Sequence, residues 1–408
     1  MNCLIDRFSF KSSLRAAGVF GLMALAGCAL FKAPAPPIMA SAPIVVTPVP
    51  AVMLARANAT HRFVLGSGQD VVGVLQVVRV GTEDTFSDIA RRFNVGYEEM
   101  VRANPGVDPW LPGVGREVVV PTRFVLPDAP REGLVINVAA MRIYYYPHHA
   151  RGEPQLVITH PIGIGKVGWR TPEGVTHIVG RVKDPVWIPT ASVRKEHLVD
   201  GDLLPAKVLA GPDNPLGAHM FRLGWPTYLI HGTNKPYGVG MRSSHGCIRL
   251  YPEDIALLFD SVPIGTAVRV VNQPVVYGWE AKTFYMQVYG PLQDDHRDWR
   301  HQLRMLLKKN TLSPLLGKLN AETPEIDWEL SQALLDIPRG MVVAVGKVDG
   351  DSVLREIQRA RHVRNALPLN ATWVGDSASL GDAAQFDQLL LEREPDLGTL
   401  SPSSLLKH

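Results

Sequence analysis

The sequence is poor in cysteine, with only Cys3, Cys28 and Cys247 among 408 residues. It also lacks an excess of either charge, because the formal net charge is +3 and no long run of lysine and arginine occurs. Nucleic-acid binding needs a clustered basic face, so this pattern argues against nucleic acid as a partner. Hydrophobic residues make up 46% of the chain, enough for sizeable cores, and the length favours two or three domains.

The N-terminal apolar run, residues 16–27, is too short to cross a bilayer as a stable helix. Three basic residues precede this run, a combination typical of a signal peptide, which we place at residues 1–27. The run ends in LAGC, from Leu25 to Cys28, which resembles the bacterial lipobox, whose cysteine becomes the lipid-bearing first residue. The alternative is an ordinary signal peptide cut nearby, with Cys28 incidental.

Cleavage at this lipobox would leave one free thiol in the exported chain. Cys3 would be discarded and Cys28 would carry lipid, so Cys247 would have no disulfide partner in an oxidising compartment. An unpaired thiol kept in such a compartment favours a role in chemistry. Ala29, rather than Asp, follows Cys28. Under enterobacterial-type sorting this indicates a periplasmic protein, anchored by lipid in the inner leaflet of the outer membrane.

Composition and periodicity divide the chain after the signal peptide. Proline and alanine indicate an extended tether, and a strand–helix–helix–strand pattern follows, whose first helix is capped by Asp84 or Thr85. Runs of β-branched and aromatic residues then predict a mainly β domain, and amphipathic segments predict an α-rich extension. The predicted parts are the tether at 28–74, the small strand–helix block at 75–123, the β domain at 131–275, the C-terminal extension at 276–345 and a poorly defined tail at 346–408.

The strand–helix–helix–strand block resembles a LysM domain, a module that binds the glycan chains of peptidoglycan, in DTFSDIA, ANPG and VVVP. It departs from the common pattern in reading TEDTF where many members read GDTL. In the β domain, His231 followed by SHGC at Ser244 to Cys247 resembles the catalytic signature of the L,D-transpeptidases, the YkuD or ErfK family. PIGIG, TPEG, PVWIPT and AGPDNPLG resemble the same family. The resemblance implies a catalytic domain of its β-sandwich type.

A cysteine nucleophile needs a base, because a thiol is mostly protonated at neutral pH and the thiolate is the reactive form. His231 ends the apolar strand TYLI, which would direct its ring toward the loop that carries Cys247. We therefore predict that Cys247 is the nucleophile and that His231 is the general base and later the general acid. The resemblance implies that the second ring nitrogen of His231 is held by the carbonyl of Gly232 rather than by an acidic side chain.

The residues just before Cys247 are predicted to build an oxyanion site. Gly246 allows the backbone to approach the substrate, so amides of His245, Gly246 and Cys247 can donate to a developing oxyanion. His245 itself either shapes the loop or takes part in the chemistry. A zinc site made of His231, His245 and Cys247 would lack further supporting ligands. We therefore expect neither a metal nor another cofactor.

Three more residues are predicted to lie at the substrate. The resemblance assigns Ser244 and Gly232 to substrate binding. Arg249 is a candidate for holding a substrate carboxylate, and an equally good alternative is that its side chain braces the loop.

The resemblance implies acyl transfer on the stem peptides of peptidoglycan. Cys247 would attack the carbonyl of the third stem residue and expel D-alanine, and an amine would then resolve the thioester. That amine belongs either to a neighbouring stem peptide, giving a cross-link, or to an outer-membrane lipoprotein, giving envelope attachment. The alternatives are an inert LysM-type tether, which would be free to lose His231 and Cys247, and an L,D-carboxypeptidase, in which water replaces the amine.

Replacing Cys28 tests the lipid anchor. We expect Cys28→Ala to move the protein from the membrane fraction to the soluble fraction, because the variant cannot receive the lipid that holds it at a bilayer. Cell fractionation followed by immunoblotting measures the change. Cys3→Ala, which alters a cysteine outside the lipobox, should remain with the membranes. Unchanged fractionation of Cys28→Ala would refute the anchor.

Overall fold

The computed structural model describes residues 61–199, 201, 203–299, 326–346, 352–368 and 371. The predicted signal peptide at residues 1–27, the predicted lipidation site Cys28 and the tether up to residue 60 lie outside the described residues. Within the described ranges, no helix combines the length and the apolar character that crossing a membrane requires.

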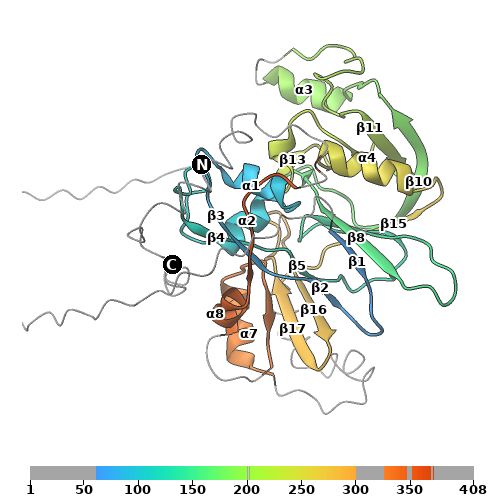
Figure 1. Ribbon diagram of the computed structural model, residues 1–408. Coiled ribbons are helices and arrows are strands. Elements are labelled where there is room, and N and C mark those ends of the chain that lie inside the picture. Colours follow the sequence, from blue (N-terminus) through green and yellow to red (C-terminus); the bar gives the residue numbers. More distant parts are fainter. Residues whose placement is uncertain are drawn as a thin grey trace, which may run out of the picture. The chain divides into compact units, whose positions relative to one another are not determined.

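One sheet of nine strands runs through the β domain (Figure 1). In sheet order its strands are β1 (His61–Val64), β8 (Leu156–Pro161), β7 (Arg142–Tyr146), β6 (Gly133–Asn137), β15 (Ala267–Val271), β10 (Gly174–Lys183), β11 (His219–Leu223), β12 (Leu229–His231) and β14 (Ile248–Arg249). The pairs β15–β6 and β12–β14 are parallel, and the other neighbours are antiparallel. All of these strands except β1 lie within residues 131–275, so the prediction of a mainly β domain there is confirmed.

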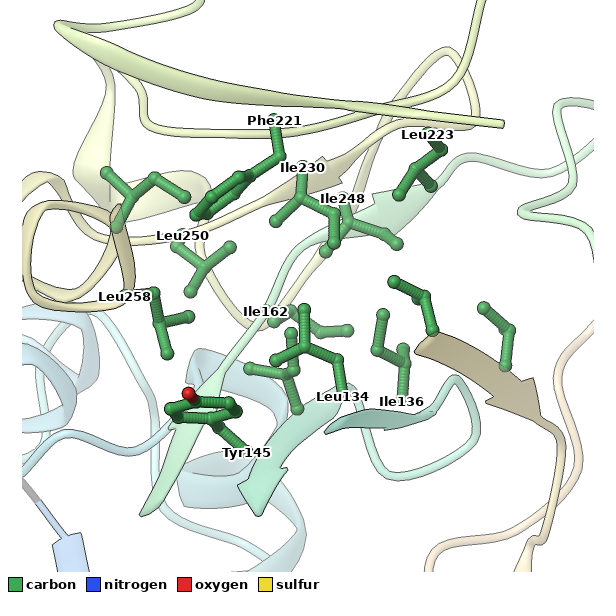
Figure 2. Close-up of a cluster of buried hydrophobic side chains, with 14 of the residues drawn as sticks. Leu134, Ile136, Tyr145, Ile162, Phe221, Leu223, Ile230, Ile248, Leu250 and Leu258 are labelled. Carbon is green, nitrogen blue, oxygen red and sulfur yellow. The ribbon is translucent and has the colours of Figure 1, made fainter. Parts of the chain in front are cut away.

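The sheet curls around the core of this domain. Leu134 of β6 packs in one cluster with Ile230 of β12 and Ile248 of β14, although three strands separate β6 from β12 in the sheet order. Figure 2 shows these side chains converging with Leu258 of α4 (Pro252–Ser261). Burial of apolar surface is the dominant favourable term in folding. This burial stabilises the positions of β12 and β14, the two strands beside the predicted catalytic residues.

The strand–helix–helix–strand block has the predicted elements. They are β3 (Gln76–Arg79), α1 (Phe86–Arg92), α2 (Tyr97–Ala103) and β4 (Glu117–Val120). Thr85, one of the two predicted caps, begins α1: its hydroxyl accepts from the Asp88 amide, and the Asp88 carboxylate accepts from the Thr85 amide. The side chain of Asn104, at the end of α2, bonds to the carbonyl of Met100 and to both backbone groups of Val119. This buried amide joins the second helix to the sheet.

Residues 61–74, which the sequence placed in the tether, are folded. β1 pairs antiparallel with β8, and β2 (Val71–Gly73) pairs antiparallel with β5 (Arg123–Val125). Leu65 packs into a buried cluster with Tyr144 of β7. Apolar residues recur in this stretch in a pattern that suits strands, and the proline-rich segment before it does not indicate where the fold begins.

Within its described residues, the C-terminal extension contains strands as well as helix. The rest of the extension, residues 300–325, lies outside the described residues. The elements described there and in the predicted tail are β16 (Val275–Glu280), β17 (Thr283–Val288), α7 (Trp328–Asp336), β18 (Val342–Ala344), α8 (Ser352–Gln358) and β19 (Arg361–His362). The segment WELSQALLD forms α7. In contrast, VVYGWE and TFYMQV form an antiparallel pair, because β-branched and aromatic residues pack well on a pleated surface. β19 pairs in parallel with β3, so the tail adds a strand to the small block.

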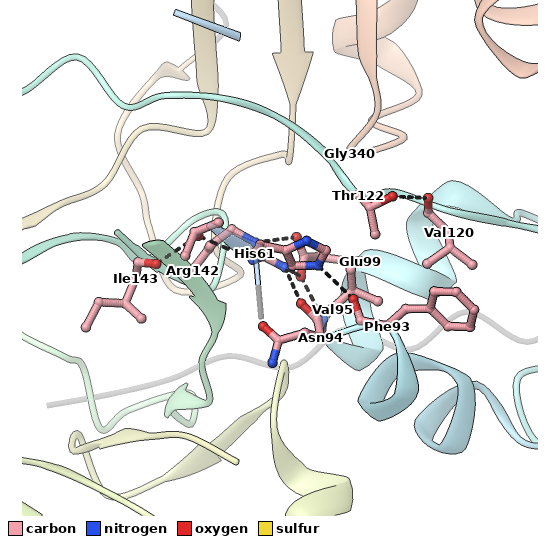
Figure 3. Close-up of polar contacts among 12 residues, drawn as sticks. His61, Phe93, Asn94, Val95, Glu99, Val120, Thr122, Arg142, Ile143 and Gly340 are labelled. Carbon is pink, nitrogen blue, oxygen red and sulfur yellow. Dashed lines mark hydrogen bonds and ion pairs between the residues drawn. The ribbon is translucent and has the colours of Figure 1, made fainter. Parts of the chain in front are cut away.

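A buried ion pair joins this block to the β domain (Figure 3). Arg142 of β7 is fully buried, and its guanidinium donates to both carboxylate oxygens of Glu99 in α2, at 3.0 and 2.8 Å. Arg142 also donates to the carbonyl of Asn94 at 3.1 Å, and the Asn94 side chain donates to Asp254 of α4 at 2.7 Å. A charge this far from water is tolerated only when it is paired and hydrogen-bonded. These contacts therefore require the two parts to stay together.

Removing the charge of Glu99 should destabilise the fold. We expect Glu99→Gln to lower the free energy of unfolding by about 3–5 kcal/mol, because it leaves the Arg142 guanidinium buried without a counter-charge. Glu117→Gln is a matched control: Glu117 pairs with Arg79 at 3.3 Å on the surface, and its loss should matter by less than about 1 kcal/mol. Urea denaturation followed by circular dichroism measures both variants. Equal effects would contradict the importance assigned to the buried pair.

Candidate active site

Strands β12 and β14 position His231 and Cys247. Their parallel pairing sets Ile230 opposite Ile248 and His231 opposite Arg249. Ile230 and Ile248 are buried in the core cluster. Since side chains alternate along a strand, His231 projects from the opposite face, and the same alternation predicts that face for Cys247, which directly precedes β14.

The imidazole of His231 is buried and held in one tautomer. Its Nδ1 lies 2.6 Å from the carbonyl oxygen of Gly232, as predicted, and because a carbonyl only accepts, Nδ1 carries the proton. Burial, followed by the charge of Arg249, lowers the pKa of His231 to about 3, although the carbonyls of Gly232 and Leu216 act in the opposite direction. The ring is therefore neutral at pH 7, and the lone pair of Nε2 is available as a base.

Cys247 is a half-buried free thiol. Its Sγ donates to the carbonyl of Thr227 at 3.6 Å. Burial raises the pKa of Cys247, while a hydrogen bond with the backbone of Leu229 and the charge of Arg249 partly offset this rise. The resting site thus combines a protonated thiol with a neutral imidazole. A thiolate forms there only when a base takes the proton.

The catalytic loop, residues 242–247, begins with β13 (Arg242–Ser244) and is ordered by a buried hydroxyl. The Oγ of Ser244 donates to the carbonyl of Cys247 and accepts from the amide of Gly246, the latter at 3.2 Å. These contacts give Ser244 a structural role in the loop, and substrate binding by Ser244 stays a prediction. They also engage the Gly246 amide, one of the three predicted oxyanion donors.

Because Gly246 has no side chain, its backbone can lie close to the ring of Tyr228. Its φ of +102° lies in the region that favours glycine, and a Cβ there would lie 2.9 Å from Cε1 of Tyr228. Any other residue at position 246 would therefore combine backbone strain with a clash against the Tyr228 ring. Close approach of the Gly246 backbone to a substrate stays a prediction; within the protein, the close neighbour is the Tyr228 ring.

His245 is held by contacts that favour its loop-shaping role. Its Nε2 lies 2.7 Å from Oε2 of Glu196 in α3 (Ala191–Val199), and its ring meets Trp169 edge-on at a centroid distance of 4.8 Å. Burial lowers the pKa of His245, with Glu196 acting in the opposite direction. Both contacts tie the ring to neighbouring segments. Within the described residues, no group of three or more His, Cys, Asp or Glu side chains is arranged to hold a metal ion.

Arg249 brings an uncompensated positive charge to the site. No acidic side chain pairs with it among the described residues, and its Nε is buried there without a hydrogen-bond partner. Burial lowers the pKa of Arg249. Its Nη1 donates to Oγ of Ser243 at 3.2 Å, which fits the bracing role. An unsatisfied guanidinium donor is also suited to an anionic substrate group, so both predicted roles have a physical basis.

Several contacts to the catalytic loop were not predicted from the sequence. Oγ1 of Thr171 donates to the carbonyl of Gly246 at 3.0 Å, and the Lys166 amide donates to the carbonyl of Ser244 at 2.9 Å. Thr171 begins TPEG, one of the motifs that resembles the family, and this was the signal that could have identified it. Glu196 has no comparable signal, because nothing near it in the sequence relates it to the loop.

Comparison with known proteins gives two family matches. The YkuD model, an L,D-transpeptidase catalytic domain, matches residues 131–270, and the LysM domain model matches residues 78–121. The probable L,D-transpeptidase ErfK/SrfK of Salmonella typhimurium is 39% identical over 282 residues, covering 68% of this chain and 88% of that protein. The probable L,D-transpeptidase YbiS of Escherichia coli is 42% identical over 239 residues, covering 58% and 76%. The solved catalytic domain of an E. faecium L,D-transpeptidase is 23% identical, with 36% of this chain and 100% of that chain covered and a TM-score of 0.26.

These matches define a two-module protein, in which a LysM domain precedes a YkuD-type catalytic domain. The chain belongs to the L,D-transpeptidase family. The predictions of an L,D-transpeptidase enzyme and of a LysM domain are therefore confirmed, and the alternative of an inert tether is not favoured.

Alkylation of Cys247 should show the raised pKa directly. An ordinary thiol has a pKa of about 8.5, so the native thiolate fraction at neutral pH is smaller than that of a free cysteine. We expect the rate of alkylation by iodoacetamide to keep rising beyond about pH 9 in the native chain, and to level off near the ordinary value in urea. Peptide mapping by mass spectrometry gives the rate at Cys247. A plateau below about pH 8 in the native chain would contradict the effect of burial.

Proposed function

We propose that this enzyme is a cysteine-dependent acyltransferase acting on peptidoglycan stem peptides. The observation that carries the proposal is a neutral imidazole of fixed tautomer at the end of β12, with a protonated thiol directly before β14, the strand that pairs with β12. His231 Nε2 takes the proton of the Cys247 thiol as Sγ attacks the carbonyl of the third stem residue. The low pKa of His231 makes the resulting imidazolium a strong acid, which suits it to return the proton to the leaving amine.

The reaction then proceeds through a thioester. The tetrahedral oxyanion collapses, the carbon–nitrogen bond breaks, and D-alanine leaves with the proton from His231. An acceptor amine next attacks the thioester, the carbon–sulfur bond breaks, and the thiol is restored. The amides of His245 and Cys247 are the proposed oxyanion donors, since the Gly246 amide is engaged by Ser244. Arg249 is proposed to hold an anionic group of the substrate.

The LysM domain and the lipobox are proposed to direct this reaction to the cell envelope. The LysM domain is proposed to hold the glycan strands whose stem peptides the catalytic domain modifies. The lipobox at Cys28 supports export to the periplasm and a lipid anchor in the outer membrane. The acceptor amine is either that of a neighbouring stem peptide or that of an outer-membrane lipoprotein, and both fit the same thioester chemistry.

A carbapenem tests the nucleophile, because opening of its β-lactam ring by a thiol leaves a covalent adduct. We expect intact-mass analysis to show one adduct on the wild-type chain and none on Cys247→Ala. His231→Ala should retain the thiol but acylate about 100-fold more slowly, because the proton acceptor is gone. An unmodified, well-folded wild-type chain would refute the proposed nucleophile.

A synthetic tetrapeptide donor separates transfer from hydrolysis. With an acceptor amine present, we expect the main product to be the amide of donor and acceptor, accompanied by release of D-alanine. Chromatography with mass spectrometry identifies the products. Exclusive release of the tripeptide acid, with and without the acceptor, would instead identify an L,D-carboxypeptidase.

A further inference from the structure

A short segment lies against the catalytic loop and is hydrogen-bonded to it at both ends. This strap, residues 165–171, follows Ile164 in β9 (Ile164–Gly165), which pairs in parallel with β13. The Lys166 amide donates to the carbonyl of Ser244 at 2.9 Å, and Thr171 Oγ1 donates to the carbonyl of Gly246 at 3.0 Å. The strap therefore bonds to two of the residues that lead into Cys247.

The first carboxylate that bridges the strap and the catalytic loop is Glu196 of α3. One of its oxygens pairs with Nζ of Lys166 in the strap, and the other accepts from Nε2 of His245 in the loop, at 2.7 Å. Because the two oxygens bind different segments, the carboxylate joins them directly. The hydrogen bond with Lys166, followed by that with His245, lowers the pKa of Glu196, which therefore remains ionised at neutral pH.

The second bridging carboxylate is Asp294, which follows β17 and lies outside the matched catalytic region at 131–270. Its Oδ1 lies 2.8 Å from Nη1 of Arg242 in the catalytic loop. Its Oδ2 lies 3.4 Å from the amide of Gly168 and 3.5 Å from Nε of Arg170, both in the strap. The side chain of Asp294 is only 12% exposed, and the bond with Arg242 is the first cause that lowers its pKa, to about 2.

Arg242 also joins this second bridge to the start of the strap. Its Nε donates to the carbonyl of Gly165 at 3.1 Å, at the start of the strap. Arg242 thus binds the strap through one nitrogen and Asp294 through another. The two bridges meet the loop at Arg242 and at His245, and these residues lie on either side of Ser243 and Ser244.

We infer that Glu196 and Asp294 are positioning residues for the proposed reaction, which hold the strap and the catalytic loop in register so that Cys247 and its amides stay aligned. This inference rests on the proposed function. Neither carboxylate contacts Cys247 or His231 in the described structure, so both act through the loop. The loop needs such support because Gly246, with its left-handed φ of +102°, has the greatest conformational freedom when unfolded. A loss of alignment of about 1 Å at a reacting atom can slow a reaction by about 100-fold.

The test compares the rate of Cys247 acylation by a carbapenem in the full chain and in variants. We expect Glu196→Gln and Asp294→Asn each to lower the rate constant about tenfold, with all molecules still becoming modified at long times. Glu173→Gln is the matched control, because Glu173 forms an exposed pair with Arg297 nearby and should leave the rate constant unchanged. With a tetrapeptide donor, kcat should fall about tenfold and KM should stay the same.

A purely structural role predicts a different result. Misfolding would reduce the final fraction of modified chains but leave the rate constant of the reactive ones unchanged, and this outcome would overturn the inference. Wild-type rate constants in both variants would overturn it too. Failure of the wild-type chain to react would instead overturn the proposed function, so the two failures are distinguishable.

A double variant tests whether Asp294 acts through the loop. If Asp294 positions Arg242, then Arg242→Gln should slow acylation as Asp294→Asn does, and Arg242→Gln combined with Asp294→Asn should be no slower than either alone. Multiplication of the two losses would show independent effects and would contradict the proposed bridge. Melting temperatures of all variants, measured in parallel, exclude a contribution from unfolding.

Discussion

The parallel pairing of β12 with β14 is the contact on which the site depends. It sets Ile230 opposite Ile248, and both side chains are buried in the core of the curled sheet. Because side chains alternate, this register sends His231 to the opposite face and predicts the same face for Cys247. A slip by one residue would turn both groups toward the core. The hydrophobic core thus specifies the chemistry, since it fixes which face each reactive side chain occupies.

Burial then sets the protonation states of the pair. It lowers the pKa of His231 and raises that of Cys247, so both are neutral before reaction. The hydrogen bond from Nδ1 to the Gly232 carbonyl supplies orientation without an acidic partner, which would have stabilised the imidazolium. Arg249 contributes a positive charge nearby. A site of this kind keeps the thiol protonated until a substrate displaces water and proton transfer accompanies attack.

The sequence predicted those features that depend on local patterns. The Thr85 cap, the two LysM helices and the bond between His231 and Gly232 each involve residues close together in the chain or a motif shared with the family. It missed β1, the strands of the extension and the two bridging carboxylates. Glu196 lies 49 residues from His245, and Asp294 lies 126 residues from Gly168. Such contacts follow from tertiary packing, and no short sequence pattern indicates which distant carboxylate will contact a given loop.

The central claim, that His231 serves Cys247 as its base, is tested most directly by a crystal structure of the enzyme acylated at Cys247 by a carbapenem. The decisive quantity is the distance from Nε2 of His231 to Sγ. We predict that Nε2 lies within about 3.2 Å of Sγ or of a single water bound to it, with Nδ1 still donating to Gly232. A ring turned away from the sulfur, or separated from it by more than one water, would contradict the assignment of His231 as the base.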